Sequence, residues 1–465
     1  MRTIGLSYQT DNCYDKYNLF VNREFMWDSK FDPSYPTSEL LFLGGGSLLN
    51  GAVSSDDTFD IRGLGLVHAI TFLLVTALLV LYARSLTAWR RLLLYALVAF
   101  IFTDIGYVAY FNSLYSEPSS LIFFCAAVVF ALAGIAKGQS NDRGWLFIIG
   151  YFAASALFVT AKFQNAFLGF PMAFFGWRLY GMVTPASKRL MPRFRWLGVG
   201  LVILLTLASA GFYGLYTELS AHARPANLYD TVFEEILGHS KTPEADAAAL
   251  GLPVSLAKYA GTSAYSTDVP AEVKSEIVSR VGYTNVIKFY LTHPGRLWNL
   301  AGRSAASSLS MRPSYLGNLE PSAVDQDKLA GQQINPSALP DDFRSRKFSA
   351  WSTIKKNCVP KTLWFLGLFL GVNVATVVLK WRYFDKMVKD YKISELHAVL
   401  ILMAVLQFFI VIIGEGEHEI VKHLFLFNLL SEICFIFLIM YMVSGVAYLW
   451  QRKTMRPRQL VIQND

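Results

Sequence analysis

The side chains best suited to chemistry lie in or beside long apolar stretches, where polar residues are costly to bury and tend to be functional. The segment 104–118 contains Asp104, Tyr107, Asn112 and Glu117. On a helix, Asp104 and Tyr107 share one side, so this carboxylate and its aromatic neighbour could bind a sugar, a cation or, through a metal, a lipid phosphate. Asp104 alone could instead hydrogen-bond to a neighbouring helix. With Asn112 and Glu117 at the end of the segment, a binding or catalytic role is the stronger interpretation.

A short polar turn at 162–165 separates two further apolar stretches and contains Lys162 and Gln164. A lysine in such a position often only extends its ammonium group to the membrane surface. It could equally pair with the phosphate of a lipid, and the sequence leaves both interpretations open.

The turn before the last apolar stretch is dense in ionisable residues, including Glu417, His418, Glu419, Lys422 and His423. The two histidines are one residue further apart than in the zinc-protease pattern HExxH. They therefore lie about 140° apart around a helix and cannot share a metal from one face. Glu419 and His423, at i and i+4, could form an acid–imidazole pair, and Lys422 could meet a phosphate. The alternative is a solvated, charged start of a helix.

Between these regions, His293 precedes a proline near an expected helix end, and Arg312 and Tyr315 lie in the polar turn 312–318. A capped helix and an ordered loop would explain these residues equally well. The sequence contains no phosphate-binding P-loop, no dinucleotide-binding glycine motif and no serine-hydrolase motif. The glycines at 44–46 lack a following Lys-Ser or Lys-Thr, and we interpret them as a flexible turn.

The composition indicates what kind of protein must position these groups. Hydrophobic residues make up 54% and charged residues 16% of the 465 residues, and the mean hydropathy is +0.37. A soluble domain has about 25% charged residues, so a disordered chain, a coiled coil and an ordinary cytosolic enzyme are excluded. A membrane-spanning helix needs about 20 residues, and nine apolar segments approach or reach that length: 64–83, 92–112, 119–136, 145–161, 166–183, 196–216, 363–380, 395–414 and 422–449. We therefore predict an all-α polytopic membrane protein with about nine transmembrane helices.

Positive charge is concentrated in five short connections between these segments. They hold 19 of the 42 Lys and Arg residues but only four acidic residues, although the net charge of the chain is only +8. Cytoplasmic loops carry such an excess of basic residues, so we expect these connections to face the cytoplasm. The positive net charge therefore indicates how the chain is oriented in the membrane, and it does not indicate a nucleic-acid partner.

The alternation of sides predicts five parts of the chain. They are an extracytoplasmic N-terminal segment, a six-helix membrane region, an extracytoplasmic helical segment, a three-helix membrane region and a cytoplasmic tail, at 1–63, 64–216, 217–362, 363–449 and 450–465. Within the third part, apolar spacing predicts short helices and then an amphipathic helix at the membrane surface, near 227–238, 270–292, 294–310 and 344–357. Cys13 and Cys358 both fall outside the membrane and could form a disulfide.

Eight stretches distributed over most of the chain resemble bacterial polytopic glycosyltransferases of the GT-C type, within the group of glycan-biosynthesis hexose transferases. They are DTFDIRGLGLVHA (57–69), DIGYVAYFNSLYSEP (104–118), AKFQNAFLG (161–169), NLYDTVFEEIL with ALGLPVSLAKYAGTSAY (227–265), YLTHP (290–294), RPSYLGN (312–318), FSAWS (348–352) and GEGEHEIVKHLFLF (414–427). The match in series, more than any single stretch, carries the resemblance.

The resemblance implies a protein of the bacterial cytoplasmic membrane that transfers a sugar, such as a hexose, from a polyprenyl-phosphate donor to a cell-surface glycan or lipid-linked acceptor. An extracytoplasmic carboxylate would deprotonate the acceptor hydroxyl, and cationic groups or a divalent metal would stabilise the departing phosphate. Glu117 and Asp104 are the expected catalytic residues. The expected substrate-binding residues are Tyr107, Asn112, Lys162, Gln164, His293, Arg312, Tyr315, Glu417, His418, Lys422 and His423.

The chain departs from the family at its start. In these enzymes the main acidic motif follows the first transmembrane helix, whereas this chain is expected to begin after that helix, inside the first outer loop. An inactive truncated homologue that acts as a scaffold therefore stays open as an alternative. A second alternative is a lipid-linked glycan transporter or flippase component that uses the same outer acids. No ligands for a metal are identified by the sequence.

Overall fold

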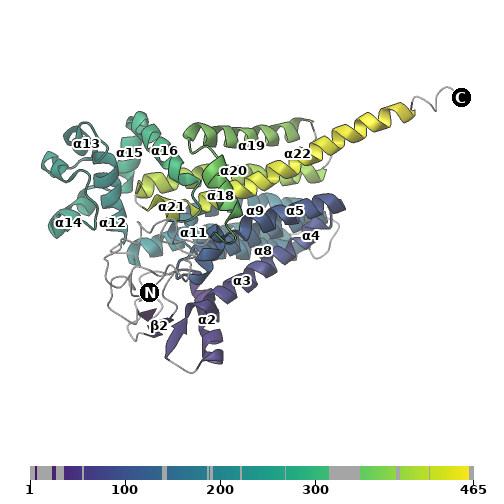
Figure 1. Ribbon diagram of the computed structural model, residues 1–465, viewed down its shortest axis with the longest axis horizontal. Helices are drawn as coiled ribbons and strands as arrows, with labels where there is room; N and C mark the ends of the chain where they lie inside the picture. Colours follow the sequence, from purple (N-terminus) through teal and green to yellow (C-terminus); the bar gives the residue numbers. More distant parts are fainter. Residues whose placement is uncertain are drawn as a thin grey trace.

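The computed structural model shows a mostly helical protein in which long apolar helices lie side by side and shorter helices gather at one end (Figure 1). This arrangement brings together polar segments that are far apart in the sequence. The residues that the structure describes are 6–7, 24–27, 36–54, 57–138, 144–185, 188, 192–219, 223–267, 269–313, 346–383, 388–417 and 419–459.

Six helical spans in the described ranges are long and apolar enough to cross a membrane. They lie in α3 with α4 (Ile61–Leu78, Val80–Ala83), α7 (Glu117–Lys137), α11 (Pro192–Leu219), α19 (Leu363–Tyr383), α20 (Val388–Glu415) and α22 (Phe425–Gln459). A seventh span results if one bent pair is counted, in which α5 (Ala88–Phe102) meets α6 (Ile105–Val108) and η2 (Ala109–Asn112) at 53°. Helices suit the apolar interior of a membrane because they satisfy their backbone hydrogen bonds internally.

Two of the nine predicted spans correspond to shorter helices. They are α8 (Gly144–Val159) and α9 (Gly169–Val183), with 16 and 15 residues, joined through the 3₁₀ helix η4 (Phe163–Leu168). A straight crossing needs about 20 residues. The structure thus confirms a polytopic helical membrane protein with six or seven candidate spans in its described part, while the number nine stays a prediction.

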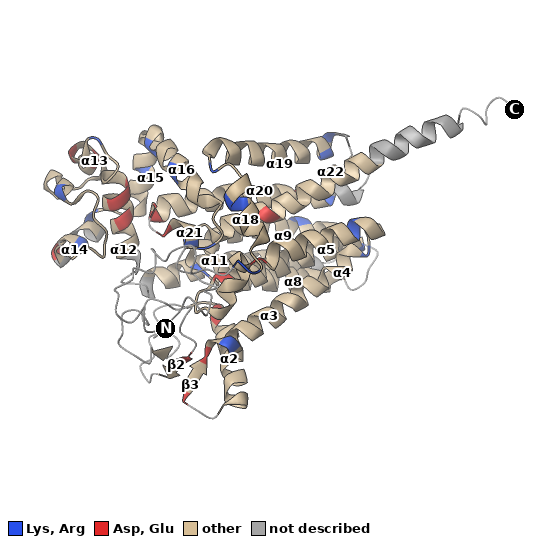
Figure 2. Cartoon of the chain, in the orientation of Figure 1, with Lys and Arg blue, Asp and Glu red and all other residues tan. Residues whose placement is uncertain are grey.

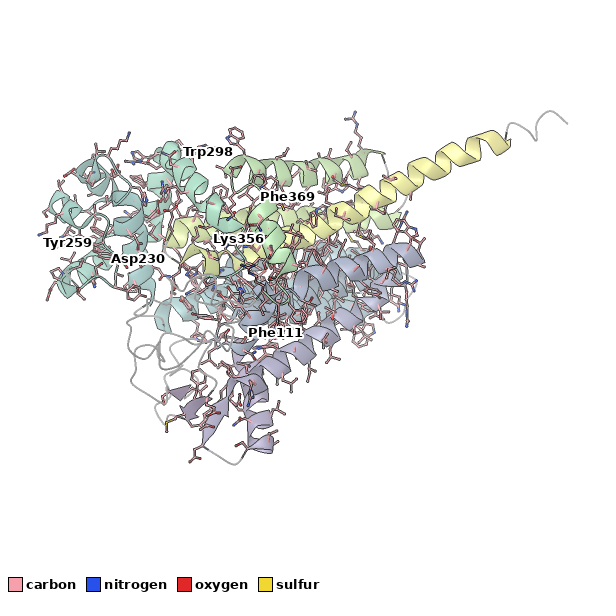
Figure 3. All side chains as sticks on the ribbon, viewed as in Figure 1. Phe111, Asp230, Tyr259, Trp298, Lys356 and Phe369 are labelled. Carbon is pink, nitrogen blue, oxygen red and sulfur yellow. The ribbon has the colours of Figure 1, made fainter. Side chains whose placement is uncertain are left out.

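Helix α7 lies at the centre of the membrane region, and 89% of its apolar window is buried. Small residues such as Ala127, Ala131 and Gly134 let neighbouring helices approach it closely. Helices α11 and α19 instead expose most of their apolar windows, as lipid-facing helices do. Figure 3 shows Phe111 among the packed side chains between the helices, whereas Phe369 lies on α19.

Charge is distributed unequally between the two ends of the helices. Basic residues lie where α4 and α19 end and α5 begins, whereas acidic residues mark the opposite end, near α2 and α12 (Figure 2). The opposite end also carries the shorter helices. This separation agrees with the clustering of Lys and Arg that the sequence shows.

The described residues of the N-terminal part include a small β-sheet. This three-stranded antiparallel sheet, in the order β1-β2-β3, consists of β1 (Leu6–Ser7), β2 (Glu24–Trp27) and β3 (Thr58–Asp60). The paired residues Phe25 and Phe59 are fully buried, and Asn50 donates to Thr58 O at 2.6 Å. Burial of the two rings therefore stabilises a sheet that the all-α prediction did not include.

The interpretation of residues 44–46 as a flexible turn was wrong, because these glycines lie inside α2 (Glu39–Val53). Helix α2 packs against α3. A Cβ atom at Gly46 would lie 3.1 Å from Leu64 Cα. The absence of a side chain thus permits the close approach of the two helices.

The segment 223–308 forms helices in each of the three regions where the sequence predicted them. They are α12 (Ala223–Tyr229), the π-helix η5 (Asp230–Leu237), α13 (Pro243–Leu250), the 3₁₀ helix η6 (Val254–Tyr259), α14 (Ala271–Arg280), α15 (Tyr283–Thr292) and α16 (Pro294–Ser308). Asp230 accepts a hydrogen bond from Ala264 N at 2.6 Å and so ties η5 to the loop after η6 (Figure 3).

The expected amphipathic helix is present as α18 (Ala350–Cys358), but it is not simply a surface helix. Lys355 is buried, and its Nζ lies 2.7 Å from Glu432 Oε1 and 2.6 Å from Asn428 Oδ1. Trp351 stacks on Phe435 and donates to the same Glu432. These contacts dock α18 against α22. Cys13 lies outside the described residues, so the predicted disulfide with Cys358 stays a prediction.

Candidate functional site

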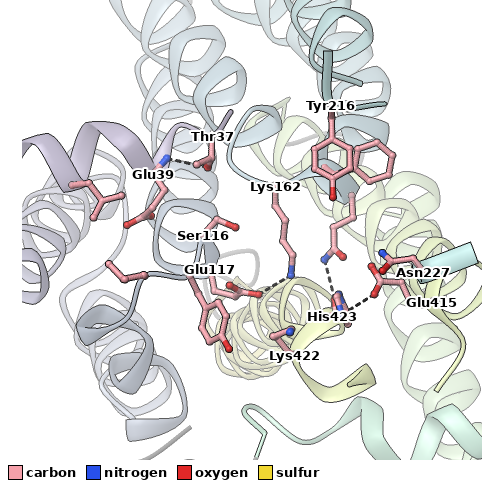
Figure 4. Close-up of a pocket in the computed structure, with 15 residues that line it drawn as sticks. Thr37, Glu39, Ser116, Glu117, Lys162, Tyr216, Asn227, Glu415, Lys422 and His423 are labelled. Atoms are coloured by element: carbon pink, nitrogen blue, oxygen red, sulfur yellow. Dashed lines mark hydrogen bonds and ion pairs between the residues drawn. The ribbon is translucent and has the colours of Figure 1, made fainter. Parts of the chain in front are cut away.

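A pocket of about 300 Å³ lies at the end of the long helices where the shorter helices gather (Figure 4). The starts of α2 and α7, the turn at 162–164, the ends of α11 and α20, and the four-residue helix α21 (Ile420–His423) all contribute to it. Its ionisable lining includes three carboxylates, two lysines and a histidine: Glu39, Glu117, Glu415, Lys162, Lys422 and His423.

Glu117 and Lys162 form an ion pair in the pocket, with 2.7 Å between Oε1 and Nζ. Glu117 is the first residue of α7, where the helix dipole favours a negative charge. Its side chain is only 3% exposed, so pairing with Lys162 offsets the cost of burying the carboxylate. The pair joins two segments that the sequence analysis singled out separately.

His423 pairs with Glu415, with 2.7 Å between Nε2 and Oε2, and the predicted pair of Glu419 with His423 was wrong. The prediction assumed one helix through both residues. Glu419 instead has a left-handed backbone (φ 43°) and precedes α21, so it contacts Lys422. Gln164 Nε2 donates to the carbonyl of His423 at 2.9 Å and ties this segment to η4.

Lys422 supplies a second positive charge to the pocket. Its Nζ lies over the ring of Tyr115, 5.4 Å from the centroid. Burial by itself would lower the pKa of Lys422, but Tyr115 and Glu419 outweigh this effect and raise that pKa above its ordinary value. Lys422 therefore remains a cation at neutral pH.

A buried pair of Glu39 and His68 completes the acidic side of the pocket. His68 Nε2 lies 2.8 Å from Glu39 Oε1, and His68 Nδ1 lies 2.9 Å from Phe111 O. A carbonyl can only accept, so Nδ1 carries a hydrogen and one further proton lies between Nε2 and Glu39. Burial raises the pKa of Glu39, although the attraction of His68 opposes the shift. Glu39 and His68 thus share a proton beside the pocket.

Three of the predicted residues have contacts elsewhere. Asp104 caps α6, since its carboxylate accepts from Gly106 N at 2.8 Å and from Ser352 N at 2.9 Å. Tyr107 donates to Glu432, and Asn112 lies against Gly65 of α3. None of the three lines the pocket, and Asp104 and Tyr107 serve contacts between segments.

The remaining predicted residues lie apart from the pocket or beyond the described ranges. His293 occupies the N-cap position of α16, and its ring stacks on Phe289 with 4.5 Å between the ring centroids. Arg312 lies near the end of the 269–313 stretch. Glu417 accepts from Arg303 Nε at 3.2 Å in a separate cluster outside the pocket. That cluster contains Glu235, whose pKa burial raises to about 7 against the attraction of Arg303. Tyr315 and His418 lie outside the described residues.

Several residues that pair with the expected site residues, or that line the pocket beside them, were not predicted from the sequence. Glu39, His68 and Glu415 were not among the residues expected to form the site. The available signal was that Glu39 and His68 each lie among apolar residues, because an isolated Glu or His in such surroundings usually has a polar partner. Which partner it has depends on the packing of the helices.

The family described as "YfdI N-terminal transmembrane domain" matches residues 1–461. The chain belongs to this family. Comparisons with curated proteins and with solved structures found no match. Together with the six long apolar helices in the described part of the chain, the family match establishes an integral, polytopic membrane protein.

Proposed function

We propose that the protein is a membrane glycosyltransferase of the GT-C type. In this proposal it moves a hexose from a polyprenyl-phosphate donor to a cell-surface glycan or lipid-linked acceptor, on the extracytoplasmic face of a bacterial cytoplasmic membrane. The observation that carries it is the pocket, where Glu117 and Glu39 face Lys162, Lys422 and His423. Carboxylates and two lysines in one cavity suit a reaction in which a hydroxyl loses its proton and a phosphate departs.

The proposed orientation follows from charge. The pocket lies at the end opposite the basic connections (Figure 2), which by the positive-inside rule would face the cytoplasm. A polyprenyl chain could then lie in lipid while its phosphate and sugar reach a pocket at the outer membrane surface. The resemblance in sequence to GT-C enzymes supports the same arrangement.

The proposed reaction is an inverting displacement. The acceptor oxygen attacks the anomeric carbon, the carbon–oxygen bond to the phosphate breaks, and polyprenyl phosphate leaves with the bonding electrons. A carboxylate, Glu117 or Glu39, takes the acceptor proton. Lys162, Lys422 and His423 stabilise the negative charge that develops on the phosphate. Lys162 would exchange its contact with Glu117 for the phosphate when the donor binds.

The test is transfer from a radiolabelled polyprenyl-phosphate hexose in membranes that contain the protein and its glycan acceptors. Glu117→Gln and Lys422→Ala should each lower the transfer rate by at least about 100-fold, the range of one acid–base or electrostatic contribution. Glu244→Gln and Lys288→Ala are matched controls, because both side chains are exposed and outside the pocket. Wild-type transfer in both pocket variants would contradict the proposal.

The same membranes separate the alternatives. A transporter or flippase component would move the lipid-linked sugar across the bilayer without forming a new glycosidic bond. A scaffold would do neither, and would show no dependence on Glu117 or Lys422. Translocation without transfer, measured as protection of the labelled lipid from an external probe, would replace the glycosyltransferase proposal with the first alternative.

A further inference from the structure

A second group of ionisable residues lies outside the pocket, between η5 and the turn after α20. Glu235 and His239 come from the end of η5 and the residues after it, Glu417 comes from the turn, and Arg303 comes from α16. One oxygen from each carboxylate and one imidazole nitrogen lie within 4.8 Å of one another. The group therefore joins two parts of the chain that are about 180 residues apart in the sequence.

The turn that carries Glu417 is held firmly against η5. Thr231 Oγ1 donates to Gly414 O at 3.0 Å, and Tyr283 OH donates to the same carbonyl at 2.9 Å. Gly416 has a left-handed backbone (φ 63°), and a Cβ atom there would lie 2.8 Å from Glu235 Cβ. The two hydrogen bonds to Gly414 O and the close approach of Gly416 to Glu235 thus fix the position of Glu417 relative to Glu235.

Arg303 engages only one oxygen of each carboxylate. Its Nη2 contacts Glu235 Oε1, and its Nε lies 3.2 Å from Glu417 Oε1. Glu235 is 3% exposed, and its second oxygen, Oε2, is buried without a hydrogen-bond partner. An ionised oxygen in that state is costly, so a cation that bound it would remove an unfavourable contact.

The imidazole is oriented for a ligand as well. His239 Nδ1 lies 3.1 Å from the carbonyl of Glu235, which can only accept, so Nδ1 carries the hydrogen and Nε2 presents its lone pair. Nε2 lies 3.7 Å from Glu417 Oε2, which is too long for a hydrogen bond. Two ligands on a tetrahedral zinc ion with bonds near 2.0 Å are about 3.3 Å apart, so a small rotation of the half-exposed His239 would bring it into place.

A small cavity beside the group adds an independent observation. It has a volume of about 30 Å³ and is lined by Glu235, His239 and Tyr290, among others. The Tyr290 hydroxyl is buried and has no hydrogen-bond partner. The cavity has room for about one water molecule or ion, and a metal-bound water there could satisfy this hydroxyl.

We propose that Glu235, His239 and Glu417 bind one divalent transition-metal ion of the zinc class, with Arg303 orienting both carboxylates. Two carboxylate oxygens and one imidazole nitrogen suit zinc better than calcium or magnesium, which prefer oxygen ligands alone. The bound ion would pin the turn at 414–417, which leads into the helix that carries Lys422 and His423. This proposal is independent of the glycosyltransferase proposal, since its test measures metal binding alone.

The test is equilibrium dialysis of the purified full chain in detergent, carrying an affinity tag without histidine, against zinc chloride after removal of metals with EDTA. We expect saturable binding of about one zinc per chain. His239→Ala and Glu417→Gln should each weaken the zinc affinity at least about tenfold. His293→Ala and Glu244→Gln are matched controls outside the group and should bind as the wild type does.

Thermal unfolding in EDTA separates ligand loss from misfolding. His239→Ala should unfold at the wild-type temperature without metal, because its side chain is half-exposed, but should lose the stabilisation that zinc confers on the wild type. Failure of the wild-type chain to bind zinc, or equal zinc affinity in His239→Ala and Glu417→Gln and the wild type, would overturn the proposal.

Discussion

Lys355 and Lys356 are neighbours in α18, yet they lie in opposite surroundings. The side chain of Lys355 is 5% exposed and is enclosed by Glu432 and Asn428, whereas Lys356 is exposed. Glu432 also accepts from Trp351 and Tyr107. The Glu432 carboxylate thus holds together α18, α22 and α6. Its partner Lys355 therefore stabilises the fold and does not lie at the membrane surface.

Replacing Lys355 with Met should therefore lower the free energy of unfolding by about 3 kcal/mol, because it leaves the buried Glu432 charge without a cation. Lys356→Met should change it by less than about 0.5 kcal/mol. Denaturant unfolding in detergent, followed by fluorescence, measures both values. Adding Glu432→Gln to Lys355→Met should recover part of the loss, since the amide is neutral and can still accept from Trp351. Equal stability of the two single variants would contradict the assignment.

At the scale of elements, the turn between α20 and α21 decides how the pocket is assembled. It ends α20 at Glu415, leaves Glu419 outside helix, and starts α21 so that Lys422 and His423 face the pocket. Gly416 makes this possible, because its left-handed backbone and missing side chain let the turn lie on Glu235.

Gly416→Ala should consequently displace the turn, through a backbone cost of about 1–2 kcal/mol and a clash with the Glu235 side chain. We expect a lower thermal unfolding temperature and faster proteolysis within 414–419. Gly414→Ala is the matched control, since a Cβ atom there would meet nothing within 4 Å. If the two variants behave alike, the turn does not depend on the Gly416 contact.

For the whole molecule, the separation of charge between the two ends predicts how the protein sits in the membrane. Translocation of loops rich in Lys and Arg is disfavoured, so the connection at 84–91 should be cytoplasmic and the segment 223–308 external. In a background with Cys13 and Cys358 replaced by Ser, a membrane-impermeant maleimide should label Glu244→Cys in intact cells. It should label Ser85→Cys only after permeabilisation. The reverse pattern would show that the pocket opens to the cytoplasm.

How much was predictable differs between fold and site. Long apolar runs and basic connections are local patterns, so the membrane-spanning helices of α3, α7, α20 and α22 could be predicted from them. Of the expected site residues, five line the pocket: Glu117, Lys162, Gln164, Lys422 and His423. The small sheet and the helical state of residues 44–46 were not predicted, because they depend on packing against other segments.

The sequence by itself determined the class of the protein and the polar groups at its disposal, since hydropathy and charge act locally along the chain. Only the tertiary structure decided the partners. It paired Glu39 with His68, His423 with Glu415, and Lys355 with Glu432. These residues are buried or nearly so, and a buried charge takes whichever opposite charge the packed helices bring within reach. That choice depends on helix positions in three dimensions, which residue spacing alone does not encode.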